Sequence, residues 1–130
     1  MALSKVTVTS SIDEQGIAVV RVEGAIVTNL SGTDAAPVMK EILHKSNPPR
    51  VILNLANVRY LDSYSFNWII KLMKECEKGE GMFAISDPND DIMALFDLSS
   101  FGKAVPVYAT EQDAREAMLG GDDSKRIANE

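Results

Sequence analysis

The feature that most constrains the fold of this chain is a regular alternation between two kinds of apolar pattern. Short runs of consecutive or alternating apolar residues, typical of strands, are followed by longer stretches in which apolar residues recur every three or four positions, which is typical of helices. Parallel strands need long connections between them, usually helices. The alternation therefore predicts an α/β fold.

The predicted elements follow the order ββαβαβαβα. The strands are predicted at residues 6–9, 17–22, 51–55, 82–85 and 105–108, and the four helices at 33–46, at 63–78, at a segment that follows 88–91, and at 110–119. The first two strands flank a turn at 13–16, where Gly16 supplies the flexible position of an antiparallel hairpin. We therefore predict a mixed, mostly parallel β-sheet with crossover helices.

Length and composition indicate one globular domain. The 130 residues fit a single domain, which we place at 1–119, and the polar, glycine-led residues 120–130 are predicted to form a flexible tail. The N-terminus lacks the pattern of a signal peptide, and no apolar run approaches the roughly 20 residues that span a bilayer. We therefore expect a cytoplasmic protein that does not act at a membrane.

The chemistry of an enzyme is missing from the sequence. There is no glycine-rich phosphate loop, and one cysteine with one histidine cannot fill a structural zinc site, so we predict no cofactor and no metal. His44 lies in a predicted surface helix, and Cys76 falls among apolar helix positions, so neither is predicted to be catalytic. A phospho-accepting receiver domain is excluded as well, because Asn54 stands where the acceptor aspartate would be. The net charge of −6 argues against a nucleic-acid partner.

The most informative segment is Tyr-Leu-Asp-Ser-Tyr-Ser-Phe at 60–66, at a predicted junction of strand and helix. Asp62 or Ser63 is suited to cap the helix, because a short side-chain oxygen accepts hydrogen bonds from the free amides of the first turn. A serine hydroxyl there is also accessible to a kinase. A phosphate would add about −1.5 to −2 charges, which a helix N-terminus tolerates. Phosphorylation is therefore predicted to change what this surface binds more than whether the domain folds.

Residues 51–63 resemble the signature of the STAS family of anti-sigma factor antagonists, in which a buried strand and a short loop lead to an Asp-Ser motif. Two later stretches, 93–101 and 110–114, resemble the family's Leu-Phe-Asp motif and the start of its final helix, in the same order. The resemblance implies a phosphorylation-regulated antagonist without enzymatic activity. An anti-sigma factor that is also a serine kinase would bind the unmodified chain and phosphorylate Ser63, and a serine phosphatase would reset it. Ser65 is an alternative phosphorylation site.

The helix predicted at 63–78 also offers a candidate partner surface. At 3.6 residues per turn, one stripe is predicted to face the sheet, made of Phe66, Ile69, Ile70, Met73 and Cys76. Two aromatic residues four positions apart and a lysine lie away from that stripe, and aromatic residues are enriched at protein interfaces. The predicted partner-binding residues are Asp62, Ser63, Tyr64, Ser65, Trp68 and Lys71.

A second function from a different class remains open. The chain could be a STAS scaffold subunit of a larger complex, either stressosome-like or associated with a transporter. The sequence does not fix the oligomeric state, and a weak homodimer is left open. Size-exclusion chromatography separates the two functions, because a monomer or dimer disfavours a large self-assembled shell.

Overall fold

A computed structural model describes residues 6–99, 101–121 and 123–127 of the chain. Five strands make one sheet in the order β1–β2–β3–β4–β5, and the strands are β1 (Thr7–Ile12), β2 (Ile17–Val27), β3 (Arg50–Leu61), β4 (Met82–Ser86) and β5 (Val107–Tyr108). The β1–β2 pair is antiparallel and the other three pairs are parallel. The predicted α/β class and the mixed, mostly parallel sheet are therefore confirmed.

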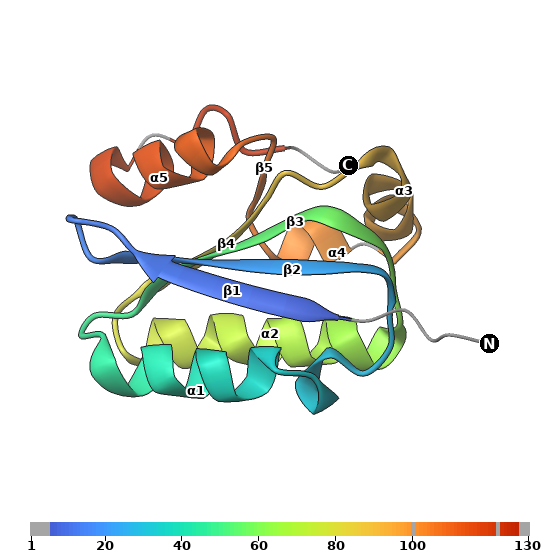
Figure 1. Cartoon of the computed structure of the whole chain (residues 1–130). Helices are drawn as coiled ribbons and strands as arrows, with labels where there is room; N and C mark the ends of the chain where they lie inside the picture. The colour runs from blue at the N-terminus through green and yellow to red at the C-terminus, as the bar shows by residue number, and fades with distance from the viewer. Residues whose placement is uncertain (1–5, 100, 122, 128–130) are drawn as a thin grey trace.

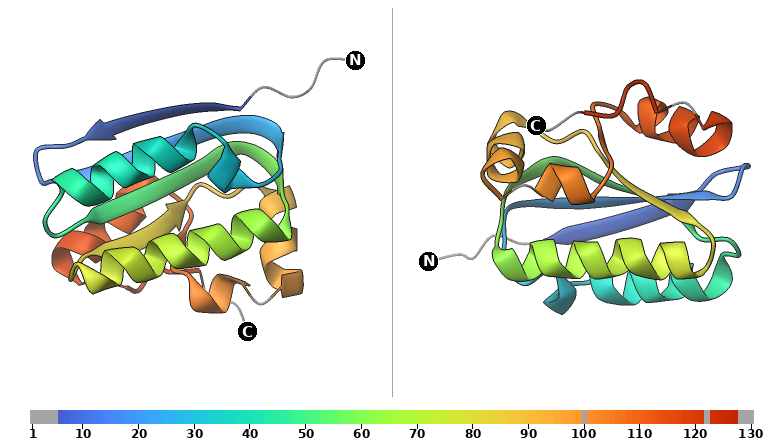
Figure 2. Two further views of the ribbon diagram at one scale, coloured as in Figure 1. Left: turned by 90° about the horizontal axis from the view of Figure 1, so that it is seen from below. Right: turned by 180° about the vertical axis from the view of Figure 1, so that it is seen from behind.

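The helices cover both faces of this sheet (Figures 1 and 2). They are α1 (Ala35–Lys45), α2 (Ser63–Lys78), α3 (Asp90–Ser99), α4 (Phe101–Ala104) and α5 (Glu111–Gly120), and a short 3-10 helix, η1 (Leu30–Gly32), precedes α1. The larger part of the core joins one face of the sheet to α1, α2 and α3, and a smaller cluster joins the opposite face to α5. The predicted order of elements holds, with η1 and α4 as additions.

Two central strands are longer than predicted. Both β2 and β3 continue past the buried segments that mark them in the sequence, to Val27 and Leu61. Their register shifts between Arg21 and Glu23; before the shift both strands are buried on both faces, and beyond it exposed positions become frequent. The extension carries both strands to the carboxyl end of the sheet, where η1 and α2 begin.

Local chemistry explains the hairpin and the last helix. Gly16 has φ +80°, which glycine adopts without strain, and the Asp13 carboxylate accepts hydrogen bonds from the amides of Gln15 and Ile17. The Thr110 hydroxyl accepts from the amide of Asp113 at 3.0 Å, which confirms the predicted cap of α5.

The described part of the predicted tail is bound to the edge of the sheet. The Ile127 amide donates to the Val107 carbonyl at 2.7 Å, and Arg126 pairs with Tyr108 in an isolated antiparallel bridge. The Tyr108 hydroxyl also donates to the Asp123 carboxylate. Residues 123–127 therefore contact β5, because the free edge of this strand offers backbone hydrogen bonds that a polar composition does not reveal. The flexibility of the tail stays a prediction.

Candidate functional site

The junction between β3 and α2 is built around the carboxylate of Asp62. Asp62 has extended backbone angles, φ −85° and ψ 174°, and caps α2 by accepting from the Ser65 amide at 2.9 Å. Both carboxylate oxygens also accept from the Asn29 amide, at 3.0 and 2.9 Å. One side chain therefore fastens the loop before η1 to the first turn of α2.

These hydrogen bonds set the charge state of Asp62. Burial alone would raise its pKa, because it removes water from the carboxylate. The hydrogen bonds from Ser65 and Asn29 favour the charged form, outweigh the burial and hold the pKa of Asp62 below its usual value.

Ser65 is an internal structural residue and not a surface one. Its side chain is fully buried, and its hydroxyl donates to Asp62 Oδ1 at 2.8 Å while it accepts from the Leu30 amide at 2.8 Å. A kinase cannot reach this oxygen in the folded domain, and a partner cannot touch it. The alternative phosphorylation at Ser65 and its role as a partner contact stay predictions, and both would need a conformation in which this side chain is exposed.

Ser63 and Tyr64 lie open to solvent beside this buried pair. Ser63 is exposed as the first residue of α2, and the Tyr64 side chain is 71% exposed. Lys71, two turns further along α2, is exposed as well. The structure thus brings Asp62, Ser63 and Tyr64 together at the carboxyl end of the sheet.

The buried stripe of α2 is rotated relative to the prediction. Ser65, Ile69, Leu72 and Cys76 are the buried residues, and Phe66, Ile70 and Met73 are only half-buried on one flank. The centre of the observed buried stripe is therefore rotated about the helix axis by about one sixth of a turn from the centre of the predicted stripe. Trp68 lies on the other flank, half-buried and facing α1, so it is not a freely exposed outer residue.

Two further exposed apolar side chains lie at the same end of the sheet. Ile26 and Tyr60 are partners in the β2–β3 register and are 55% and 42% exposed. The sequence analysis missed this pair because residues 56–61 were not expected to be part of a strand. Tyr60 could have indicated this surface in the sequence, since tyrosine combines an apolar ring with a polar tip and is common at protein interfaces.

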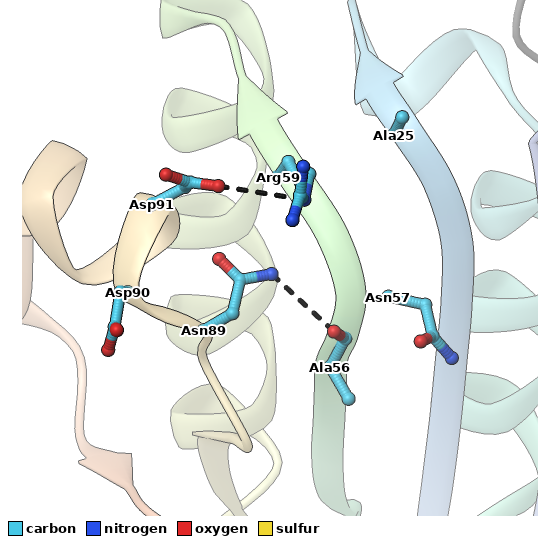
Figure 3. Close-up of a pocket in the computed structure, with 7 residues that line it drawn as sticks. All are labelled: Ala25, Ala56, Asn57, Arg59, Asn89, Asp90 and Asp91. Carbon is cyan, nitrogen blue, oxygen red and sulfur yellow. Dashed lines mark hydrogen bonds and ion pairs between the residues drawn. The ribbon is translucent and has the colours of Figure 1, made fainter.

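A polar hollow of about 630 Å³ lies between the ends of β2 and β3 and the start of α3 (Figure 3). Asn89 organises it: its amide donates to the Val58 carbonyl at 2.6 Å, and its oxygen accepts from the Ile92 amide at 3.0 Å. Arg59 lies 3.6 Å from Asp91 on the opposite wall. Two pairs form within the lining, Asn89 with the Ala56 carbonyl and Arg59 with Asp91, and the lining residues offer no nucleophile beside a base (Figure 3).

Asn54 has a structural role within β3, at the last position where this strand pairs with β4. Its amide nitrogen donates to Asp87 at 3.0 Å and to Glu111 at 2.6 Å, and Glu111 also pairs with Arg21 at 2.9 Å. These contacts fasten the start of α5 to β2 and β3. An amide serves this bridge because it donates to two carboxylates at once.

His44 and Cys76 lie where the sequence analysis expected them. Cys76 is fully buried, and desolvation raises the pKa of its thiol to about 12, so the reactive thiolate is suppressed. His44 is exposed on α1. Among the described residues, no three His, Cys, Asp or Glu side chains gather as metal ligands.

No helix in the described ranges combines the length and the apolar composition needed to cross a membrane.

Comparison with known proteins relates this architecture to a family. An anti-sigma F factor antagonist of Paenibacillus polymyxa is 26% identical over 100 residues, which make up 77% of this chain and 85% of that protein. An anti-sigma factor antagonist structure from Mycobacterium paratuberculosis superimposes with a TM-score of 0.74 at 21% identity, covering 88% of this chain and 94% of that one.

A second solved structure is the Bacillus cell fate determinant SpoIIAA in the phosphorylated form. Its TM-score is 0.61 at 17% identity, and the match covers 85% of this chain and 97% of that one. At these identities the two solved structures show a shared fold. The family model of the STAS domain matches residues 10–114, which is most of the chain. The chain therefore belongs to the STAS domain family.

Proposed function

We propose that this chain is a phosphorylation-regulated anti-sigma factor antagonist, a binding protein that acts in the cytoplasm and not an enzyme. In its unmodified form it binds an anti-sigma factor that is also a serine kinase, and this frees the sigma factor. Phosphorylation of Ser63 releases the partner, and a serine phosphatase restores the binding form. The Paenibacillus polymyxa relative, an anti-sigma F factor antagonist, supports this assignment.

The observation that carries the proposal is the contrast between Ser63 and Ser65. Ser63 is exposed at the head of α2, whereas Ser65 is buried with its hydroxyl fully engaged. A serine kinase therefore has one accessible serine hydroxyl in the first turn of this helix. A phosphate on Ser63 would sit near free amides at the helix N-terminus, so the domain itself tolerates the charge.

The proposed partner surface surrounds Ser63. It comprises Asp62, Ser63 and Tyr64, together with the exposed pair Ile26 and Tyr60, and Lys71 lies at its border. Exposed aromatic and apolar side chains provide the contact area. A phosphate placed inside such a contact would break it through desolvation and repulsion.

A capture experiment with variants at Ser63 tests the proposal. The wild-type chain and Ser63→Ala are expected to retain the same kinase partner from cells that express the chain natively, and Ser63→Asp is expected to lose most of it. Ser11→Asp is the matched control, because Ser11 is an exposed serine on β1 near the hairpin, at the other end of the sheet (Figure 1). Equal capture by all four chains would show that Ser63 does not control binding.

The scaffold function predicts a different result in solution. A subunit of a large self-assembled particle would sediment as a high-mass species on its own. Under the proposal above, sedimentation velocity gives a monomer or a weak homodimer.

A further inference from the structure

The sheet has one open edge, along β1. This strand stands at the end of the strand order and pairs with β2 alone (Figures 1 and 2). At the other end of the sheet, β5 is covered in part, because the Ile127 amide donates to the Val107 carbonyl there. Within the described ranges, no residue outside β2 exchanges a backbone hydrogen bond with residues 7–12. One side of β1 therefore leaves its backbone groups to solvent.

The pairing pattern identifies the groups on that open side. The Asp13 amide donates to the Ile17 carbonyl at 3.0 Å, so these two residues form a hydrogen-bonded pair of the antiparallel hairpin. Such pairs recur at every second residue of an antiparallel ladder, and the residues between them turn their amides and carbonyls to the other side. The register of β1 with β2 is uninterrupted, so this alternation holds along the whole strand. The residues whose backbone groups face outward are Val8, Ser10 and Ile12.

β1 lacks the features that usually protect a free edge. Its six residues, Thr-Val-Thr-Ser-Ser-Ile, include no charged residue and no proline, and no bulge interrupts its pairing. Natural proteins place such features on free edges to prevent pairing with another strand. The side chain of Ile12 is also 56% exposed. An open, uncharged edge on a chain with a net charge of −6 favours a strand as its partner.

The open edge is complementary to itself. When two copies of β1 run antiparallel about a two-fold axis through Ser10, Ser10 opposes Ser10 of the second copy, and Val8 opposes Ile12 of the second copy. Every outward amide then meets an outward carbonyl. Each half-buried Val8 covers an exposed Ile12, and no two like charges oppose each other along the strand. These matches favour a second copy of the chain over an unrelated strand.

We propose that the chain forms a two-fold symmetric dimer through this open edge, with the two β1 strands antiparallel and the two sheets joined into one. The contact is confined to one short strand, so the association is weak and depends on protein concentration. Ser63 follows β3, which β2 separates from β1, so each copy keeps the surface around Ser63 free (Figure 2). The dimer does not depend on the phosphorylation proposed above.

Sedimentation equilibrium of the full chain and amide hydrogen exchange test the proposal together. The average mass is expected to rise from monomer to dimer between micromolar and millimolar concentrations. Over the same range, exchange of the outward amides of Val8, Ser10 and Ile12 should slow by roughly tenfold. The amides of Thr9 and Ser11 bond to β2 already in the monomer, so their exchange should stay nearly constant.

Variants at the two-fold axis separate this edge from other surfaces. Ser10→Lys places two like charges opposite each other and should weaken dimerisation about fivefold. Ser10→Pro removes an outward amide that has no partner in the monomer, and it should weaken dimerisation about tenfold. Ser31→Lys is the matched control and should leave dimerisation unchanged, because Ser31 is an exposed serine on η1, outside β1.

A chain that stays monomeric up to millimolar concentration would overturn the proposal. So would a dimer in which the outward amides of β1 exchange as fast as in the monomer, because another surface would then form the contact. Equal dimerisation by the wild type and both Ser10 variants would overturn it as well. None of these measurements involves Ser63, so failure of the dimer and failure of the proposed function are separate outcomes.

Discussion

Two serines in the first turn of α2 have opposite roles. A helix turns by about 100° per residue, so positions two apart point in nearly opposite directions. Ser63 therefore faces solvent while Ser65 faces the core, where its hydroxyl joins the Asp62 carboxylate to the Leu30 amide. The accessible hydroxyl is available for modification, and the buried one holds the loop that supports it.

This contrast predicts unequal costs of removing each hydroxyl. Ser65→Ala leaves the Leu30 amide buried without its acceptor, so the free energy of unfolding should fall by about 1–3 kcal/mol. Ser63→Ala should change it by less than about 0.5 kcal/mol, because Ser63 is exposed. Urea denaturation measures both. Equal values for the two variants would contradict the placement of these side chains.

The carboxylate of Asp62 predicts a specific dependence of stability on pH. Its folded-state pKa is lowered, so the charged form stabilises the fold above the unfolded-state pKa of about 3.9, and this contribution is lost as the pH falls through the lower folded-state value. Asp62→Asn keeps a capping oxygen but loses its charge, so it should lower the free energy of unfolding by about 0.5–1 kcal/mol near neutral pH, and the difference from wild type should shrink below about pH 4.

The matched control is Asp34→Asn, because the Asp34 side chain makes no capping hydrogen bond at the start of α1. The free energy of unfolding of Asp34→Asn should stay equal to that of the wild type across the same pH range. A difference for Asp62→Asn that stays constant down to the lowest pH would show that its charge does not contribute.

At the scale of elements, the turn between α2 and β4 depends on a close backbone approach. A Cβ atom at Gly81 would lie 1.7 Å from the Pro49 carbonyl oxygen, and that same oxygen accepts from the Met82 amide at 2.9 Å. A side chain there must separate the start of β4 from the residues before β3. Gly81 therefore fixes how α2 returns the chain to the sheet.

Gly81→Ala is expected to lower the free energy of unfolding by about 2–3 kcal/mol through this overlap. Gly120→Ala provides the comparison, since a Cβ there meets nothing within 4 Å and alanine is the better helix former. That variant should be neutral or stabilising by up to about 1 kcal/mol. Thermal unfolding of both variants measures these changes. A Gly81→Ala variant as stable as the wild type would contradict the close approach of the backbone.

The elements also show how far sequence patterns predict this fold. The bounds of α2 and the order of elements follow from periodicity, because strands and helices bury residues at different intervals. The rotation of α2 does not follow, since pattern analysis treats Ser65 as polar and assigns it to the outside. Its burial depends on the Leu30 amide, 35 residues earlier in the chain, and only the folded structure brings the two together.

The candidate site could be predicted only in part, because some of its residues are far apart in the sequence and meet only in the folded structure. Asp62 and Ser63 are recognisable locally, as a cap and an exposed hydroxyl at a helix start. Ile26 and Tyr60 become neighbours only through the parallel register of β2 and β3. Trp68 was placed on the correct helix, but its contact with α1 depends on how the two helices pack.

At the scale of the whole molecule, the potential contact surfaces are spatially separated. The proposed switch lies at the carboxyl end of the sheet, α1 and α2 cover one face of the sheet, and α5 covers the opposite face (Figures 1 and 2).

The most direct test of the central claim is native mass spectrometry of the complex with its kinase partner, before and after ATP is added. The account predicts that the chain gains one phosphoryl group, that peptide mapping places it on Ser63, and that the modified chain leaves the complex. A complex that persists after modification, or a phosphoryl group on another residue, would contradict it.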